Sequence, residues 1–132
     1  MNKTIRWQQR FENYEKAFAQ LEKTIAIKKP NDAERAGLIQ FFEVSFELAW
    51  KTLRDYLESA GYTTQSPRDA IKQAFQSQLI SNGEAWLEAL DNRNLTVHTY
   101  DEKTAVKIET LIRKSYYPEL KAFHKDFGKK KT

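Results

Sequence analysis

Residues 7–25 read WQQRFENYEKAFAQLEKTI, a stretch in which large apolar residues recur at alternating intervals of four and three. The apolar positions are Trp7, Phe11, Tyr14, Phe18, Leu21 and Ile25. This spacing places them along one face of an α-helix, as in helices that pack nearly antiparallel to one another. The sequence therefore predicts a first amphipathic helix, which Lys28, Lys29 and Pro30 end.

A second helix is expected from about residue 31 to Gly61. Asn31 followed by Glu34 is typical of a capping box at its start. Its apolar residues cover more than one stripe, so it is predicted to contact neighbours on two sides and to be the central helix. They are Leu38, Ile39, Phe41, Phe42, Phe46, Trp50, Leu53, Tyr56 and Leu57.

Three further helices follow. Ser66, Pro67 and Asp69 are typical of a helix start, and the helix is predicted over 67–79. Residues 81–83 form a turn, and a fourth helix is predicted over 84–100. The fifth helix begins near Ala105 and is kinked by Pro118. The expected fold is all-α, a four- to five-helix antiparallel up-and-down bundle, with one domain over 1–127 and a flexible Lys-rich tail over 128–132.

The composition of the chain bears on its cellular location and on the charge of its possible partners. A length of 132 residues suits a single core, and the chain has no cysteine, no apolar signal segment and no stretch that would span a membrane, so a cytoplasmic location is expected. The net charge is +4, but 18 acidic residues are spread among 22 basic ones. This balance permits an anionic partner without requiring one.

Several kinds of site are excluded by the sequence. It contains no Gly-rich phosphate loop, no metalloprotease motif and no paired-aspartate signature of nucleotidyl transfer, so the chain is not expected to be a nucleotidyltransferase itself. The two histidines, His98 and His124, are 26 residues apart. No metal site and no cofactor are therefore expected.

The one dense group of polar residues is DNRNLTVHTYDE at positions 91–102. If these residues are α-helical, Asp91, Asn94, His98 and Asp101 share one side, and Arg93 and Tyr100 nearly superimpose on the next. These positions let Asn94 steady the His98 imidazole. A histidine that shuttles protons and an arginine that holds phosphate suit metal-independent RNA cleavage, and a symmetric dimer burying this helix face would supply two of each.

A structural interpretation competes with this one. Polar residues at a helix end often form a capping and interface network, with Asp101 as a cap, and spacing alone favours that interpretation over catalysis. Glu47 and Lys51 belong to a four-residue repeat that usually marks a salt-bridged surface. Their position beside Trp50 keeps a role in binding a partner or a substrate open for both.

The segment Arg93-Asn-Leu-Thr-Val-His98-Thr-Tyr100 resembles the Arg-x4-His-x-Tyr motif of HEPN-domain proteins (higher eukaryotes and prokaryotes nucleotide-binding). With the blocks FELAWKTL at 46–53 and DYL at 55–57, Ser66-Pro-Arg68 and Trp86, the likeness spans about residues 5–125 and is closest to the nucleotidyltransferase substrate-binding branch. The resemblance implies a dimerising helical bundle and a partner, a minimal nucleotidyltransferase encoded nearby. Such a pair resembles a kanamycin-nucleotidyltransferase-like enzyme split in two.

The resemblance also implies roles for individual residues. Related HEPN subunits are toxins of toxin–antitoxin systems, in which Arg93 and His98 would serve RNA cleavage and Tyr100 would be adenylylated by the partner. The leading hypothesis is thus a metal-independent endoribonuclease whose site uses Arg93, Asn94, His98 and Tyr100. The alternative is a non-catalytic subunit that completes the partner's active site, with Glu47, Lys51 and the Arg93 region, including Asp91 and Asp101, binding substrate or partner. A purely structural dimer is a third interpretation.

Overall fold

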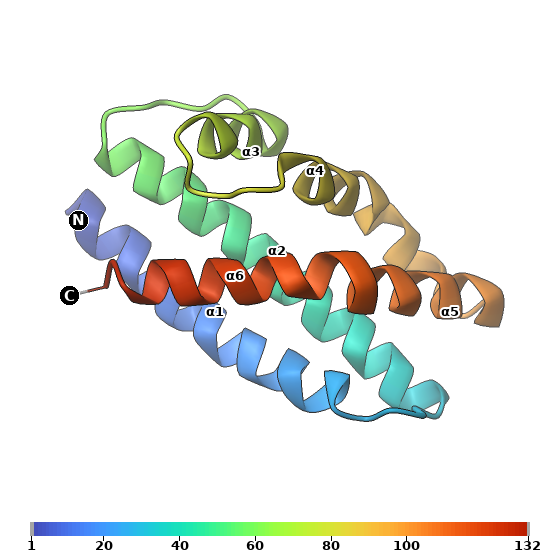
Figure 1. The fold of residues 1–132 in the computed structure, drawn as a ribbon. Helices are drawn as coiled ribbons and strands as arrows, with labels where there is room; N and C mark the ends of the chain where they lie inside the picture. The colour runs from blue at the N-terminus through green and yellow to red at the C-terminus, as the bar shows by residue number, and fades with distance from the viewer. Residues whose placement is uncertain (1, 132) are drawn as a thin grey trace.

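Helix α1 spans Lys3–Ile25 and helix α2 spans Asp32–Ser59 in the computed structural model, which describes residues 2–131. The two helices run antiparallel and pack along their lengths (Figure 1). The predicted capping box forms, because Asn31 Oδ1 accepts from the Glu34 N–H at 2.8 Å and Glu34 Oε1 accepts from the Asn31 N–H at 2.9 Å. Two main-chain donors that a helix start leaves unpaired are thereby satisfied.

Two short helices follow α2, namely α3 (Pro67–Gln76) and α4 (Gly83–Asn92). Ser66 caps α3 as predicted, with its Oγ 3.0 Å from the N–H of Asp69. The helix ends three residues before the predicted Leu79, where Gln78 adopts a φ of 62°. A left-handed residue at this place ends the helix, because it turns the chain out of the helical path.

The C-terminal fifth of the chain forms one continuous rod that crosses the α1–α2 pair (Figure 1). It consists of α5 (Glu102–Leu111), the π-helical turn η2 (Ile112–Tyr116) and α6 (Tyr117–Gly128). The kink expected at Pro118 is accommodated by the π turn, in which the Tyr117 N–H bonds to the carbonyl of Ile112, five residues earlier. A wider turn suits a proline, because its ring clashes with the carbonyl four residues back and it has no N–H to donate.

Aromatic side chains join α1 to α2 and to α6, and Trp86 of α4 packs against rings of the same two helices, α2 and α6. Trp7, Phe11, Tyr14, Phe18 and Leu21, five of the six predicted α1 positions, are at most 3 % exposed. Tyr14 meets Phe123 of α6 edge-on at 4.9 Å between ring centroids, and its hydroxyl donates to the Leu120 carbonyl at 2.8 Å. Residues 2–131 contain no strand, and the predicted helical bundle is confirmed.

The residues after α6 contact the body of the bundle. Lys130 Nζ lies 5.4 Å from the centre of the Tyr56 ring, and Lys131 Nζ lies 2.9 Å from Glu15 Oε1. The flexibility expected of residues 128–132 stays a prediction, and Thr132 lies outside the described residues.

Candidate functional site

The polar motif occupies a 3-10 helix rather than the end of an α-helix. Helix α4 ends at Asn92, and η1 (Arg93–His98) follows with no fully buried residue. The predicted α-helix over 84–100 is therefore wrong for its second half. The segment is rich in Asn and Thr, which favour other backbone conformations, and only the half-buried Leu95 packs against the core. Thr96 Oγ1 donates to the Arg93 carbonyl three residues earlier at 2.6 Å.

This geometry changes how the motif residues meet. A 3-10 helix has three residues per turn, so the α-helical stripe predicted for Asp91, Asn94, His98 and Asp101 does not form. Among residues 2–131 no hydrogen bond joins Asn94 to His98. Instead His98 Nδ1 lies 3.3 Å from the hydroxyl of Tyr100, with the two rings edge-on at 5.9 Å.

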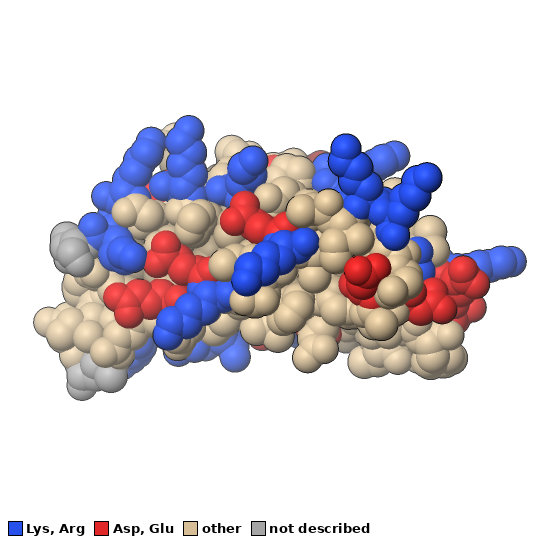
Figure 2. All heavy atoms as spheres, turned by 90° about the horizontal axis from the view of Figure 1, so that it is seen from below, with Lys and Arg blue, Asp and Glu red and all other residues tan. Residues whose placement is uncertain are grey.

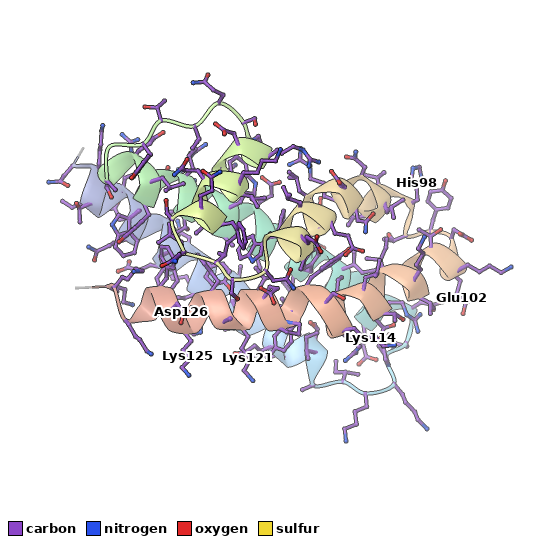
Figure 3. All side chains as sticks on the ribbon, turned by 45° about the horizontal axis from the view of Figure 1, so that its top comes forward. His98, Glu102, Lys114, Lys121, Lys125 and Asp126 are labelled. Carbon is purple, nitrogen blue, oxygen red and sulfur yellow. The ribbon has the colours of Figure 1, made fainter. Side chains whose placement is uncertain are left out.

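His98 and Tyr100 lie at the surface. Tyr100 is 85 % exposed and Val97 is 68 % exposed, the two highest values among the large apolar and aromatic residues of the described chain. Figure 3 shows His98 at the end of the bundle where α5 begins. A reacting group can therefore approach the imidazole from solvent or from a second protein surface.

Arg93 turns back onto α2. Its Nη1 lies 3.2 Å from Oε1 of Glu47, whose second oxygen, Oε2, accepts from the Trp50 indole at 3.1 Å and lies 3.9 Å from Lys51 Nζ. The structure thus brings Glu47 and Lys51, singled out by their four-residue spacing and their position beside Trp50, next to the motif arginine. The Arg93 side chain is 40 % exposed, which leaves guanidinium N–H groups able to reach a phosphate.

The two flanking carboxylates have structural partners. Asp101 Oδ2 accepts from both the N–H of Thr104 at 3.2 Å and its hydroxyl at 2.6 Å, so Asp101 is the N-cap of α5, as the capping interpretation predicts. Asp91 pairs with Arg68 at the start of α3. Sequence reasoning gave Arg68 no partner, since nothing in the local pattern links positions 23 residues apart.

A small cleft lies beside Tyr100. It encloses about 200 Å³ between the N-terminal turn of α2 and the start of α5. Its lining residues are Asp32, Arg35, Ala36, Thr99, Tyr100, Glu102 and Ala105. Arg35 is held there by Glu109, at 2.8 Å between Nε and Oε1. The end of the motif is thereby placed over the first turn of α2, which sequence spacing did not indicate.

Neither a metal cluster nor a membrane span accompanies the motif in the described chain. Residues 2–131 contain no cluster of three or more His, Cys, Asp or Glu that would hold a metal ion. Within the same range, no helix combines the length and the apolar character needed to cross a membrane.

Comparison with known proteins shows which family the chain belongs to. Residues 9–129 match the model of a family described as nucleotidyltransferase substrate binding protein like. The chain belongs to this family. The family is HEPN-like, in agreement with the resemblance carried by Arg93, His98 and Tyr100, and its description implies partnership with a nucleotidyltransferase.

Two relatives support the assignment to the nucleotidyltransferase substrate-binding family. A crystal structure of a protein from Thermus thermophilus superimposes with a TM-score of 0.76 and 34 % sequence identity, covering 88 % of this chain and 97 % of that one. A Haemophilus influenzae protein named Probable ribonuclease HepT is 32 % identical over 78 residues, or 55 % of this chain. The match spans only 53 % of that protein, about half its length.

Proposed function

We propose that this chain is the HEPN subunit of a two-component system with a minimal nucleotidyltransferase, and that it cleaves RNA without a metal ion. The observation that carries the proposal is the exposed motif, with Arg93 anchored on α2 and His98 3.3 Å from the Tyr100 hydroxyl. The name of the Haemophilus influenzae relative points to the same activity.

The chemistry needs a base, an acid and a cation. A neutral imidazole removes the proton of a ribose 2′-hydroxyl, and the 2′-oxygen then attacks the neighbouring phosphorus. The bond from phosphorus to the 5′-oxygen breaks, and that oxygen takes a proton from a second imidazole, leaving a 2′,3′-cyclic phosphate and a 5′-hydroxyl. Arg93 would stabilise the charge that develops on the non-bridging oxygens, and Asn94, exposed on the same turn, would hydrogen-bond the phosphate.

One copy of the chain supplies only one motif arginine and one motif histidine. A symmetric dimer through the η1 surface would supply the second imidazole. Val97 and Tyr100, exposed by 68 % and 85 %, are the apolar surface that such a dimer would cover. We therefore propose a homodimer whose composite site lies between the two η1 segments.

Tyr100 gives the partner a means of control. Transfer of a nucleotide from ATP would form a bond between the phenol oxygen and the α-phosphorus, with pyrophosphate as the leaving group. The product would place an anionic phosphodiester next to His98, where the phenol hydroxyl now lies at 3.3 Å. This group would occupy the place of the RNA phosphate, so the modified subunit would be inactive.

The deciding experiment is cleavage of total RNA by the purified chain in EDTA. His98→Ala and Arg93→Ala should abolish cleavage, and the fragments should end in a 2′,3′-cyclic phosphate. His124→Gln is the matched control, because His124 lies outside the motif and pairs with Glu15 on α1. Cleavage that survives in His98→Ala would refute the proposed site.

The second candidate function is a non-catalytic subunit that binds the substrate of the nucleotidyltransferase. The ion pair of Arg93 with Glu47 favours it, because it places Arg93 beside Glu47 and Lys51, which this alternative expects to bind the substrate or the partner. Absence of cleavage by the wild-type chain, together with formation of a complex with the nucleotidyltransferase that Arg93→Ala weakens, would establish this second function instead.

A further inference from the structure

Helix α2 presents a stripe of mostly polar residues beside the motif. Ala36, Glu47 and Arg54 are separated by eleven and seven residues, close to three and two full helical turns, so they share one face, with Lys51 between the last two. The stripe faces the motif, because Ala36 lines the cleft beneath Tyr100 and Glu47 binds Arg93. The segment from Arg93 to Tyr100 therefore runs antiparallel to α2 along this stripe.

Beyond Arg93 the stripe continues with cations. Lys51 Nζ and the guanidinium carbon of Arg54 lie 5.9 Å and 5.5 Å from the centre of the Trp50 ring. Their side chains are 37 % and 31 % exposed, whereas Trp50 itself is only 7 % exposed. The indole thus serves as a buried support on which the two charged groups reach the surface.

Carboxylates on this part of the stripe are few. Glu47 is shared between Arg93 and Lys51, and Asp55, 1 % exposed, lies beneath the surface between Arg10 and Arg54. The opposite direction along α2, toward its N-terminus, carries the exposed Glu43. Arg35, near that end, is paired with Asp32 and Glu109, so the positive charge beside the motif lies toward Lys51 and Arg54, as far as Glu58 one turn beyond Arg54.

We propose that Lys51 and Arg54 bind the phosphates of a single RNA strand that leaves the motif along α2 on the Arg93 side. The inference rests on the proposed function. From Glu47 to Arg54 the helix rises roughly 10 Å, which is about three nucleotides of a stacked strand at ~3.4 Å each. Arg93, Lys51 and Arg54 would then contact successive stretches of one backbone, positioning the strand without reading its sequence.

A membrane fits this surface less well. A helix that lies on a membrane offers exposed apolar side chains between its cations, but the one large apolar residue between Lys51 and Arg54 is buried. On the face shown in Figure 2, Lys and Arg lie among Asp and Glu. The net positive charge of the chain therefore forms no continuous run of cations on that face.

The test is the salt dependence of binding of a 2′-O-methyl single-stranded oligonucleotide of about 12 residues, which lacks the nucleophile and stays uncut. Removing one phosphate contact should lower the slope of log K against log salt by about 0.7. Lys51→Ala should lower it by about 0.7 and Lys51→Ala/Arg54→Gln by about 1.4. Gln is chosen at position 54 because its amide can still donate to Asp55.

Lys121→Ala is the matched control, because Lys121 is an exposed lysine on α6, away from His98 (Figure 3). Binding of the strand by Lys51 and Arg54, here called the track, would be overturned by unchanged slopes in the Lys51 and Arg54 variants. An equal fall of the slope in Lys121→Ala would overturn it as well. Cleavage of a dinucleotide, which is too short to extend from the motif as far as Arg54, tests the motif separately. If the dinucleotide is cut but the slopes do not change, only the track fails; if the wild-type chain neither binds nor cuts RNA, the proposed function fails with it.

Discussion

Replacing Asp55 by Asn should destabilise the fold far more than removing a neighbouring surface carboxylate. Asp55 lies between α1 and α2 with 1 % of its side chain exposed. Its Oδ2 lies 2.5 Å from Arg10 Nε and its Oδ1 lies 3.2 Å from Arg54 Nε. A buried carboxylate is tolerated only when it is paired and hydrogen-bonded, and here both oxygens are.

The size of the effect follows from what remains after the substitution. Asn keeps the volume but removes the charge, so two charge-assisted bonds worth about 1.5–3 kcal/mol each are broken or weakened. The arginines are 28 % and 31 % exposed, so water replaces part of each broken bond. The free energy of unfolding should therefore fall by about 2–3 kcal/mol. With an unfolding entropy of about 2.1 cal/mol/K per residue, this lowers Tm by about 7–11 °C for 132 residues.

The assay is urea and thermal unfolding followed by circular dichroism. Glu58→Gln is the matched control, since Glu58 joins the same two helices one turn later through Arg6, at 3.2 Å and with side chains 27 % and 41 % exposed. That exposed pair should contribute about 0–1 kcal/mol. Equal losses of stability in the two variants would refute the argument that burial makes the difference.

Three other predictions concern the same bundle and are measured by urea unfolding. Tyr14→Phe removes a buried hydrogen bond to a main-chain carbonyl of α6 and should cost about 1 kcal/mol; a loss under about 0.3 would contradict this. Asn31→Ala removes the capping box and should also cost about 1 kcal/mol, whereas Asn31→Gly should cost only a few tenths. Burial raises the pKa of Glu109, but hydrogen bonds from Arg35 and Arg113 outweigh burial and hold that pKa below its usual value. Glu109→Gln should therefore be less stable than wild type above about pH 4.3, with the difference disappearing as pH falls through the lowered pKa, and a difference that persists at about pH 2 would contradict this.

Most of the fold was predictable because local signals and packing agree. The alternation of four and three residues from Trp7 to Leu21 predicts a buried helix face, and that face is buried. Asn31 and Ser66 predict two helix starts from side chains that act within three residues. Such features need no knowledge of distant parts of the chain.

Where the structure differs from the predicted helices, the causes are local features that the periodicity of apolar residues does not show. The positions from Arg93 to His98 fit a helical pattern, but their Asn and Thr side chains favour other backbone conformations and none of them is fully buried, so a 3-10 segment results. Pro118 predicts that the regular helical hydrogen bonding is interrupted, but not how. A kink and a π turn can both accommodate a residue that has no N–H to donate. Contacts such as Arg93 with Glu47 join residues 46 apart, and only the packed helices bring them together.

The placement of the motif has a consequence for every functional test. The buried core of the bundle is built from residues of all six α-helices and of η2, and η1 contributes no fully buried side chain to it. Arg93→Ala and His98→Ala should therefore leave the fold stable to within about 0.5 kcal/mol, as expected for surface substitutions. A loss of cleavage or of partner binding in these variants can then be attributed to the motif itself. The same exposure explains why the chain is proposed to act with a second surface: Val97 and Tyr100 remain uncovered in the single subunit, and one histidine alone cannot serve as base and acid in the same step.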